Sequence, residues 1–93
     1  REFVEKGIVR DPNTHKAILI HLWNFFEEGG FIVKGLIFSP ILGAKGNIEF
    51  FFHLSLNGGE PTAAEEIAER VSWVVDEAHH LLRKKAPGRV GEG

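Results

Sequence analysis

Cysteine and methionine are both absent from this 93-residue chain. Without cysteine, the chain forms neither a disulfide bond nor a zinc site built from thiolates. Its first residue is Arg1, where translation would place methionine, so we expect the sequence to be a piece of a longer protein. It has no apolar run of about 18 residues, the length that a membrane-spanning helix needs, and its charged start does not resemble a secretory signal. These absences predict a cytoplasmic protein that makes no membrane contact.

An excess of positive charge is also absent, because the formal net charge is -2 at pH 7. Any contact with nucleic acid is therefore expected to be local. Five histidines are present, but their spacing does not suit chelation of one ion. His79 and His80 are adjacent and would diverge by about 100° on a helix, and His15 and His21 are six positions apart. We therefore predict no metal site.

Two stretches have the pattern of helices, in a chain whose length suits one small domain. The first is expected over 11–28, where Asp11 can cap the free N–H groups and Pro12 suits the first helical position. The second is expected over 62–85, where apolar residues recur every three to four positions. It begins at Thr62 with the sequence T-A-A-E, which matches a capping box.

Two strands are expected between these helices, at 31–39 and 47–56. Proline and two glycines lie in the connection, which predicts an antiparallel hairpin with a longer loop. Both strands are apolar on both faces, whereas an exposed antiparallel hairpin would alternate apolar and polar residues. We therefore expect helices on both sides of these strands, or a larger sheet.

Glu49 and the loop before it are candidates for function. Glu49 lies just inside the expected second strand, so it is either a solvent-facing acid on an edge strand or a group that does chemistry there. The loop contains Lys45 and glycines, which would suit phosphate binding. It lacks the G-x-x-x-x-G-K-[ST] pattern and no helix follows it, so the residues alone favour an ordinary hairpin loop.

Two motifs together resemble a known family. The sequence G-I-V-R-D-P-N-T-H at 7–15, followed by S-P-I-L-G-A-K-G-N-I-E-F at 39–50, looks like the C-terminal part of the TlyA-type hemolysin A family. These proteins are FtsJ/RrmJ-like rRNA 2′-O-methyltransferases. The resemblance is strong from the start to about residue 56 and looser over the final helix.

This resemblance implies an α/β fold. The chain would be the C-terminal fragment of a Rossmann-like domain that uses S-adenosylmethionine, arranged helix–strand–strand–helix with an antiparallel hairpin. The S4-like RNA-binding part and the cofactor-binding part of the family would lie before Arg1. We therefore expect the cofactor site to be absent from this chain, and the fragment alone to be inactive.

The family also implies roles for individual residues. Its catalytic set is a Lys–Asp–Lys–Glu tetrad, of which only the last member can be placed, at Glu49. Ligands of open α/β sheets bind beyond the carboxyl ends of the parallel strands, and an antiparallel strand begins at that same edge. Ser39, Lys45 and Asn47 would overhang this edge and contact ribosomal RNA. The alternative is a non-catalytic module that binds RNA or protein through the 39–47 loop.

A free strand edge would follow from the same placement. In the resembling fold, the strand at 47–56 is flanked by a fifth parallel strand that this chain does not contain. Its unpaired backbone groups and its aromatic side chains would then recruit another strand. We expect the isolated chain to form a homodimer, joined along this strand or by exchange of a helix.

Overall fold

The structure is a computed structural model that describes residues 10–56 and 59–83. Four main elements follow one another: α1 (Pro12–Glu28), β1 (Ile32–Phe38), β2 (Phe50–Ser55) and α2 (Ala64–Ala78). A short 3₁₀ turn, η1 (Ala44–Gly46), lies between the strands, and a π-helical turn, η2 (His79–Arg83), continues α2. The predicted α/β arrangement of two helices and one antiparallel hairpin is confirmed.

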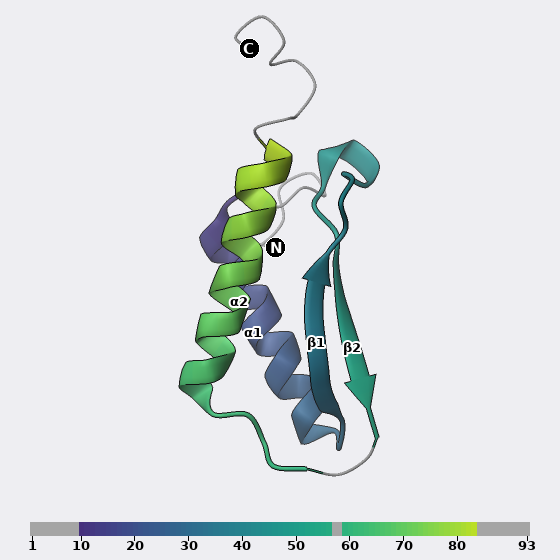
Figure 1. The fold of residues 1–93 in the computed structure, drawn as a ribbon, viewed down its shortest axis with the longest axis vertical. Coiled ribbons are helices and arrows are strands. Elements are labelled where there is room, and N and C mark those ends of the chain that lie inside the picture. Colours follow the sequence, from purple (N-terminus) through teal and green to yellow (C-terminus); the bar gives the residue numbers. More distant parts are fainter. Residues whose placement is uncertain (1–9, 57–58, 84–93) are drawn as a thin grey trace, which may run out of the picture.

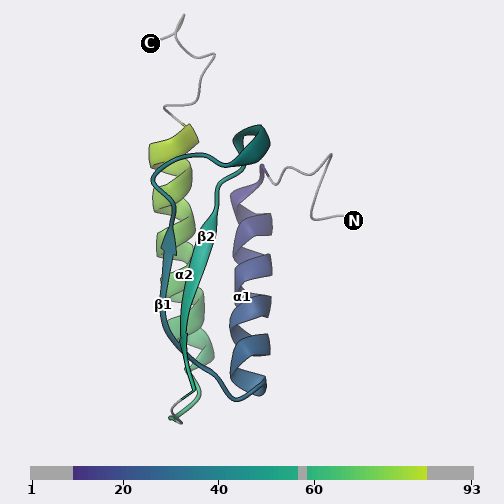
Figure 2. The same cartoon turned by 90° about the vertical axis from the view of Figure 1, so that its right-hand side faces the viewer.

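Both helices lie on the same side of the hairpin, so the chain forms one layer of helices and one layer of strands (Figure 1). The view in Figure 2, turned by 90°, shows the same two layers. Helices on both sides of the strands, one of the two expected arrangements, are therefore not found among the described residues. On the outer face, Ile37 pairs directly with Phe51, and the two residues are 62% and 52% exposed. Because α1 and α2 pack on each other, they share one face, and no other described element covers the second face.

The core lies between the two layers. Trp23, Val71 and Val75 have no exposed surface, and Ile67 is almost as deeply buried. The same cluster includes further buried residues from α1 and β1, namely Leu19, Val33 and Leu36. Burying a large apolar side chain contributes about 1.5–3 kcal/mol, so this cluster is the main source of stability.

A β-bulge in β1 changes which face of the sheet its later side chains point to. Val33 pairs with Leu54 and Leu36 pairs with Phe52, so three steps along β1 match two steps along β2. The extra residue, Lys34, is exposed. Strict alternation would send Val33 and Leu36 to opposite faces, and the bulge lets both of them face the helices.

The start of α1 agrees with the sequence pattern, and the start of α2 does not. Asp11 accepts a hydrogen bond from the backbone N–H of Asn13 at 3.0 Å, as an N-cap residue does. The expected capping box at Thr62 is wrong. The helix begins two residues later, and its N-cap residue, Ala63, makes no side-chain bond.

Thr62 binds the end of α1 instead. Its hydroxyl donates to Glu27 Oε2 at 2.6 Å, and its backbone N–H donates to Glu27 Oε1 at 3.1 Å. The indole N–H of Trp23 also donates to the same carboxylate, at 3.1 Å. Desolvation raises the pKa of Glu27, but the hydrogen bonds from Thr62 and Trp23 outweigh it, and the pKa is lowered overall. The carboxylate therefore fastens the 59–63 segment to α1.

Replacing Glu27 by glutamine removes the charge that accepts these bonds. We expect the free energy of unfolding at neutral pH to fall by about 1–3 kcal/mol, as measured by urea denaturation. Glu28→Gln, at the next position and exposed, is the matched control.

The pH dependence of this loss has a definite sign. Because folding lowers the pKa of Glu27, its contribution is fully present above the ordinary carboxyl pKa. It is lost as the pH falls through the lowered pKa. A difference between wild type and Glu27→Gln that stays constant throughout acidification would contradict this assignment.

Candidate functional site

The connection between β1 and β2 is an ordered loop held by backbone hydrogen bonds. The N–H of Ser39 donates to the carbonyl of Glu49 at 2.8 Å and closes its base. Further along, the N–H of Gly43 donates to the carbonyl of Asn47 at 2.7 Å. The loop lies at the end of the sheet where α1 begins and α2 ends (Figure 1). We call residues 39–49 the hairpin loop.

Ser39 is part of the internal structure of this loop. Only 8% of its surface is exposed. Its hydroxyl oxygen accepts a hydrogen bond from the backbone N–H of Ile41 at 3.3 Å. This bond fixes the turn through Pro40, so Ser39 shapes the loop from below its surface.

Lys45 and Asn47 lie at the outer turn of the loop. Lys45 is exposed and has a φ of 59°, a left-handed conformation that no other non-glycine residue among those described adopts. Such backbone strain amounts to about 1–3 kcal/mol and is often found at binding sites. Asn47 is half-buried, and its N–H donates to the carbonyl of Ala44 at 3.0 Å. The turn therefore presents a lysine side chain to solvent.

Glu49 lies just before β2, rather than inside the strand as the sequence suggested, because β2 begins at Phe50. The residue before it, Ile48, is only 5% exposed and anchors this part of the chain. The side chain of Glu49 passes directly over Gly43. A Cβ atom built on Gly43 would lie 2.7 Å from Cδ of Glu49, so the end of this exposed side chain would have to move aside. The φ of Gly43 is -86°, which any residue can adopt, so glycine here provides room for the Glu49 side chain in its present position.

The structure brings Glu49 together with the first half of the loop but shows no side-chain bond between Glu49 and Lys45. Among residues 10–56 and 59–83, Glu49 forms no ion pair. Its exposed carboxylate is therefore available to accept a hydrogen bond from a cationic or hydroxyl group. Three cavities, of about 380, 320 and 230 Å³, open elsewhere, and Glu49 lines none of them.

A pair of histidines also meets close to the loop, which the sequence reasoning missed. His15 Nδ1 and His79 Nε2 are 2.7 Å apart, although the residues are 64 positions apart in the chain. His15 is 7% exposed, and its ring packs against the edge of Phe50 at 5.0 Å between centroids. In the part of the chain that is described, no third potential ligand joins them to form a metal-binding group. The available signal was that His15 continues the buried positions Leu19 and Trp23 at four-residue spacing.

No helix among the described residues is long and apolar enough to cross a membrane. No family model matches the chain. It is 46% identical, over 81 residues and 87% of its length, to "Putative rRNA methyltransferase YqxC" of Bacillus subtilis (strain 168). The chain spans 29% of the length of that relative.

Two solved structures resemble the chain as well. "Putative hemolysin from Streptococcus thermophilus" matches 90% of it with 40% identity and a TM-score of 0.73. A second "putative hemolysin", from Lactococcus lactis, matches 77% with 38% identity and a TM-score of 0.58. The chain spans 30% and 36% of these two chains. The resemblance drawn from the sequence motifs is confirmed, and it concerns one part of longer proteins.

The close approach of Gly43 and Glu49 can be tested by a double-mutant cycle. Gly43→Ala places a methyl group where the Glu49 side chain lies, and because that exposed side chain can move aside, we expect a loss of at most about 1 kcal/mol in the free energy of unfolding. The same substitution in a Glu49→Ala background removes the overlap, and most of the loss should disappear.

Gly35→Ala is the control for this cycle, because its nearest neighbour, His53 Cβ, would lie at an ordinary 3.9 Å. Glu49→Ala should not change the effect of Gly35→Ala. If both glycine substitutions respond equally to Glu49→Ala, the packing of Glu49 on Gly43 is refuted.

Proposed function

We propose that this chain is part of an S-adenosylmethionine-dependent rRNA 2′-O-ribose methyltransferase. The premise is its similarity, over most of its length, to one part of a relative named as an rRNA methyltransferase and of two hemolysin structures. In this proposal the chain completes a Rossmann-like domain, Glu49 is its catalytic carboxylate, and Ser39, Lys45 and Asn47 border the RNA. The packing of Glu49 over Gly43 carries the proposal, because both residues belong to the motif on which the resemblance rests.

The position of the loop supports this placement. Ligands of open α/β sheets bind beyond the carboxyl ends of the parallel strands. β1 ends at Phe38 and runs straight into the hairpin loop, and Glu49 immediately precedes the antiparallel strand β2. The carboxylate and the exposed Lys45 therefore belong to the sheet end at which substrate would bind if β1 were one of the parallel strands.

The reaction in this proposal is methylation of a ribose 2′-hydroxyl. A hydroxyl is a poor nucleophile at neutral pH, so it needs orientation and partial removal of its proton. The neutral amine of a lysine outside this chain would take the proton of the 2′-hydroxyl as its oxygen attacks the methyl donor, and the Glu49 carboxylate would hold that lysine in place. Lys45 would contact an RNA phosphate by charge, and Ser39 would hold the turn that presents Lys45.

S-adenosylmethionine would supply the methyl group when bound by the complete enzyme. The described residues do not fit a site for it, because no helix N-terminus follows the hairpin loop and the three cavities lie away from Glu49. The chain would thus contribute only to the substrate side of the reaction. We accordingly expect the isolated chain to be inactive.

The proposal is tested by Glu49→Ala in the full-length enzyme. We expect methyl transfer to RNA to fall by about a hundredfold or more, since a positioned group in proton transfer contributes on this scale. The melting temperature should stay the same, because Glu49 is exposed. Glu28→Ala removes an exposed acid at the end of α1 and should leave the rate unchanged.

Full activity of Glu49→Ala, at an unchanged melting temperature, would make Glu49 a simple surface acid. The alternative function is a non-catalytic module that binds RNA or protein through the 39–47 loop. It predicts a different result in the same assays. Lys45→Ala would weaken RNA or protein binding while methyl transfer remained insensitive to Glu49. The two functions are thereby distinguished in one set of variants.

We further propose that the isolated chain forms a homodimer. Each strand of the hairpin has one edge without a partner strand among the described residues. Phe50 and Phe52 already pack against the helices, so the apolar gain at the free edge of β2 would come from Phe51 on the outer face. Pairing β2 with β2 of a second copy would satisfy backbone groups along this edge and bring the outer-face side chains of the two β2 strands, Phe51 among them, side by side.

Sedimentation of the isolated chain over a range of concentrations tests this dimer. We expect wild type to associate and Phe51→Lys to remain monomeric, because a lysine in the contact would have to be desolvated. Phe25→Lys is the control, since Phe25 is 60% exposed on α1 and lies outside the strands. A monodisperse wild-type monomer at high concentration would rule the dimer out.

A further inference from the structure

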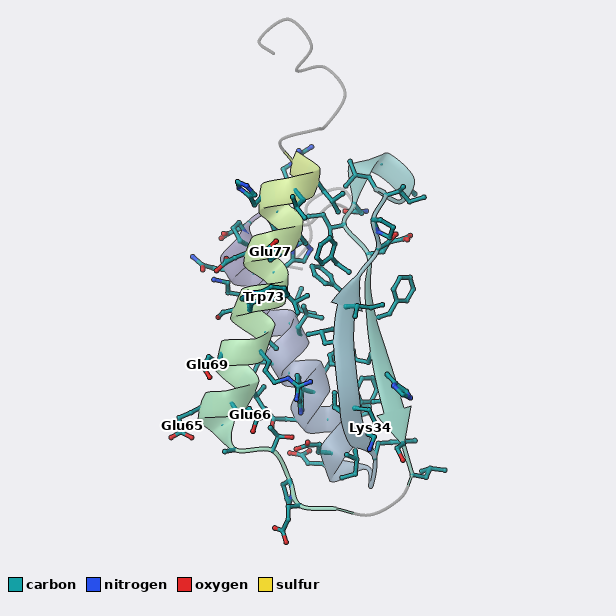
Figure 3. The ribbon with its side chains drawn as sticks, in the orientation of Figure 1. Lys34, Glu65, Glu66, Glu69, Trp73 and Glu77 are labelled. Atoms are coloured by element: carbon teal, nitrogen blue, oxygen red, sulfur yellow. The ribbon has the colours of Figure 1, made fainter. Side chains whose placement is uncertain are left out.

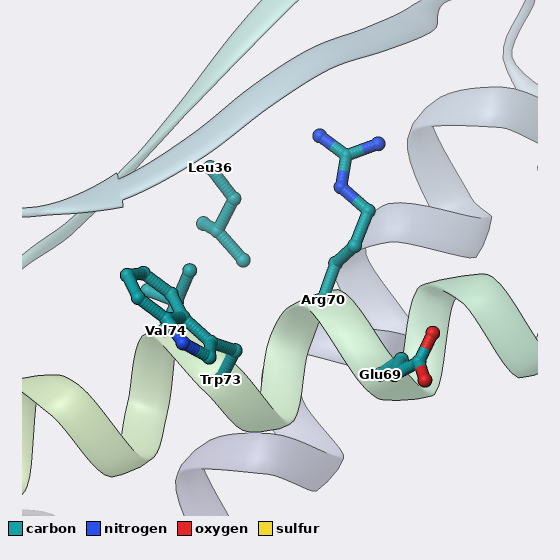
Figure 4. Close-up of a pocket in the computed structure, with 5 residues that line it drawn as sticks. All are labelled: Leu36, Glu69, Arg70, Trp73 and Val74. Carbon is teal, nitrogen blue, oxygen red and sulfur yellow. The ribbon is translucent and has the colours of Figure 1, made fainter.

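A groove opens between α2 and β1, on the side of the molecule away from α1. It has a volume of about 380 Å³ and is lined by Leu36, Glu69, Arg70, Trp73 and Val74 (Figure 4). We call this the Trp73 groove. Leu36 and Val74 are each 7% exposed and form its floor, whereas Trp73 is 64% exposed. A tryptophan held at the surface beside an apolar hollow is typical of a binding hot spot.

Glu69 and Arg70 are the charged residues that line the Trp73 groove, and the helix that carries them is acidic overall. The helix α2 carries five acidic side chains and one basic side chain. Glu69 and Glu77 lie four positions before and after Trp73, and therefore on the same face of the helix. Two more acids, Glu65 and Glu66, extend this row toward the start of α2 (Figure 3).

The single base of α2 pairs with Glu66 and therefore offsets only part of this row. The guanidinium of Arg70 lies 4.9 Å from the centre of the Trp23 ring, so it is directed toward α1. One of its nitrogens is 3.6 Å from a carboxylate oxygen of Glu66. Glu69 and Glu77 form no ion pair among the described residues.

We propose that the Trp73 groove binds a basic polypeptide segment that carries a large apolar side chain. The apolar side chain would enter between Trp73 and Leu36, and flanking lysines or arginines would meet Glu69 and Glu77. An RNA strand is disfavoured because its phosphates would face these carboxylates. A second copy docked by the same face is disfavoured too, since two acidic rows would oppose each other. This binding does not depend on the proposed methyl transfer.

The test uses a synthetic peptide of alternating lysine and leucine as the probe. Trp73 reports on its binding by fluorescence, and Trp73→Phe identifies the part of the signal that comes from the buried Trp23, over whose ring Arg70 lies. We expect a saturable blue shift and protection of Trp73 from acrylamide quenching. A peptide of alternating glutamate and leucine should give neither effect, and polylysine, which lacks the apolar side chain, should bind more weakly.

Variants of the protein show where the peptide binds, and the affinity is measured through a fluorophore attached to the peptide. Trp73→Ala and the double variant Glu69→Lys/Glu77→Lys should each weaken binding on the order of tenfold. Glu28→Lys and Glu60→Lys change exposed acids outside the groove and should have little effect. Circular dichroism confirms that each variant is folded.

Two results would overturn the proposal. One is equal weakening by the groove variants and by Glu28→Lys, which would mean attraction to net charge alone. The other is the same shift of Trp73 fluorescence with an RNA oligonucleotide, or on concentrating the protein without peptide. In that case the occupant of the groove is RNA or a second copy.

Discussion

The structure depends on one side chain, Trp23, which ties the two helices to the hairpin. Its ring has no exposed surface and meets Phe52 of β2 edge to face, at 6.2 Å between centroids. Arg70 of α2 lies over the same ring, and the indole N–H donates to Glu27. Because Glu27 also binds Thr62, a single aromatic group connects α1, β2, α2 and the segment that leads into α2.

The candidate site lies at the other end of the molecule, where a second hydrophobic cluster stabilises it. Ile48, Ala78 and Leu82 form a second small cluster, which joins the base of the hairpin loop to the end of α2. His15 and His79 meet beside Phe50, which also packs on this cluster. Glu49 is therefore an exposed acid that directly follows a buried anchor. Such an arrangement holds a carboxylate in position without enclosing it, as expected if other parts of a longer protein complete the site.

Local patterns in the sequence succeeded where the deciding residues are close neighbours. The cap at Asp11, the proline after it and the apolar spacing of α2 all act within one or two helical turns, and those features are present in the structure. The capping box failed because the hydroxyl of Thr62 binds Glu27, which is 35 positions away. The sequence around Thr62 contains no sign of that competing acceptor.

The sequence by itself determined the order of the elements, the hairpin and the motif that contains Gly43 and Glu49. The tertiary structure alone decided which faces are covered, that His15 meets His79, and that Trp73 stays exposed beside a groove. The physical reason is the distance along the chain over which each interaction acts. Capping and helical periodicity depend on neighbouring residues, whereas burial and long-range hydrogen bonds depend on which distant segments the core brings together.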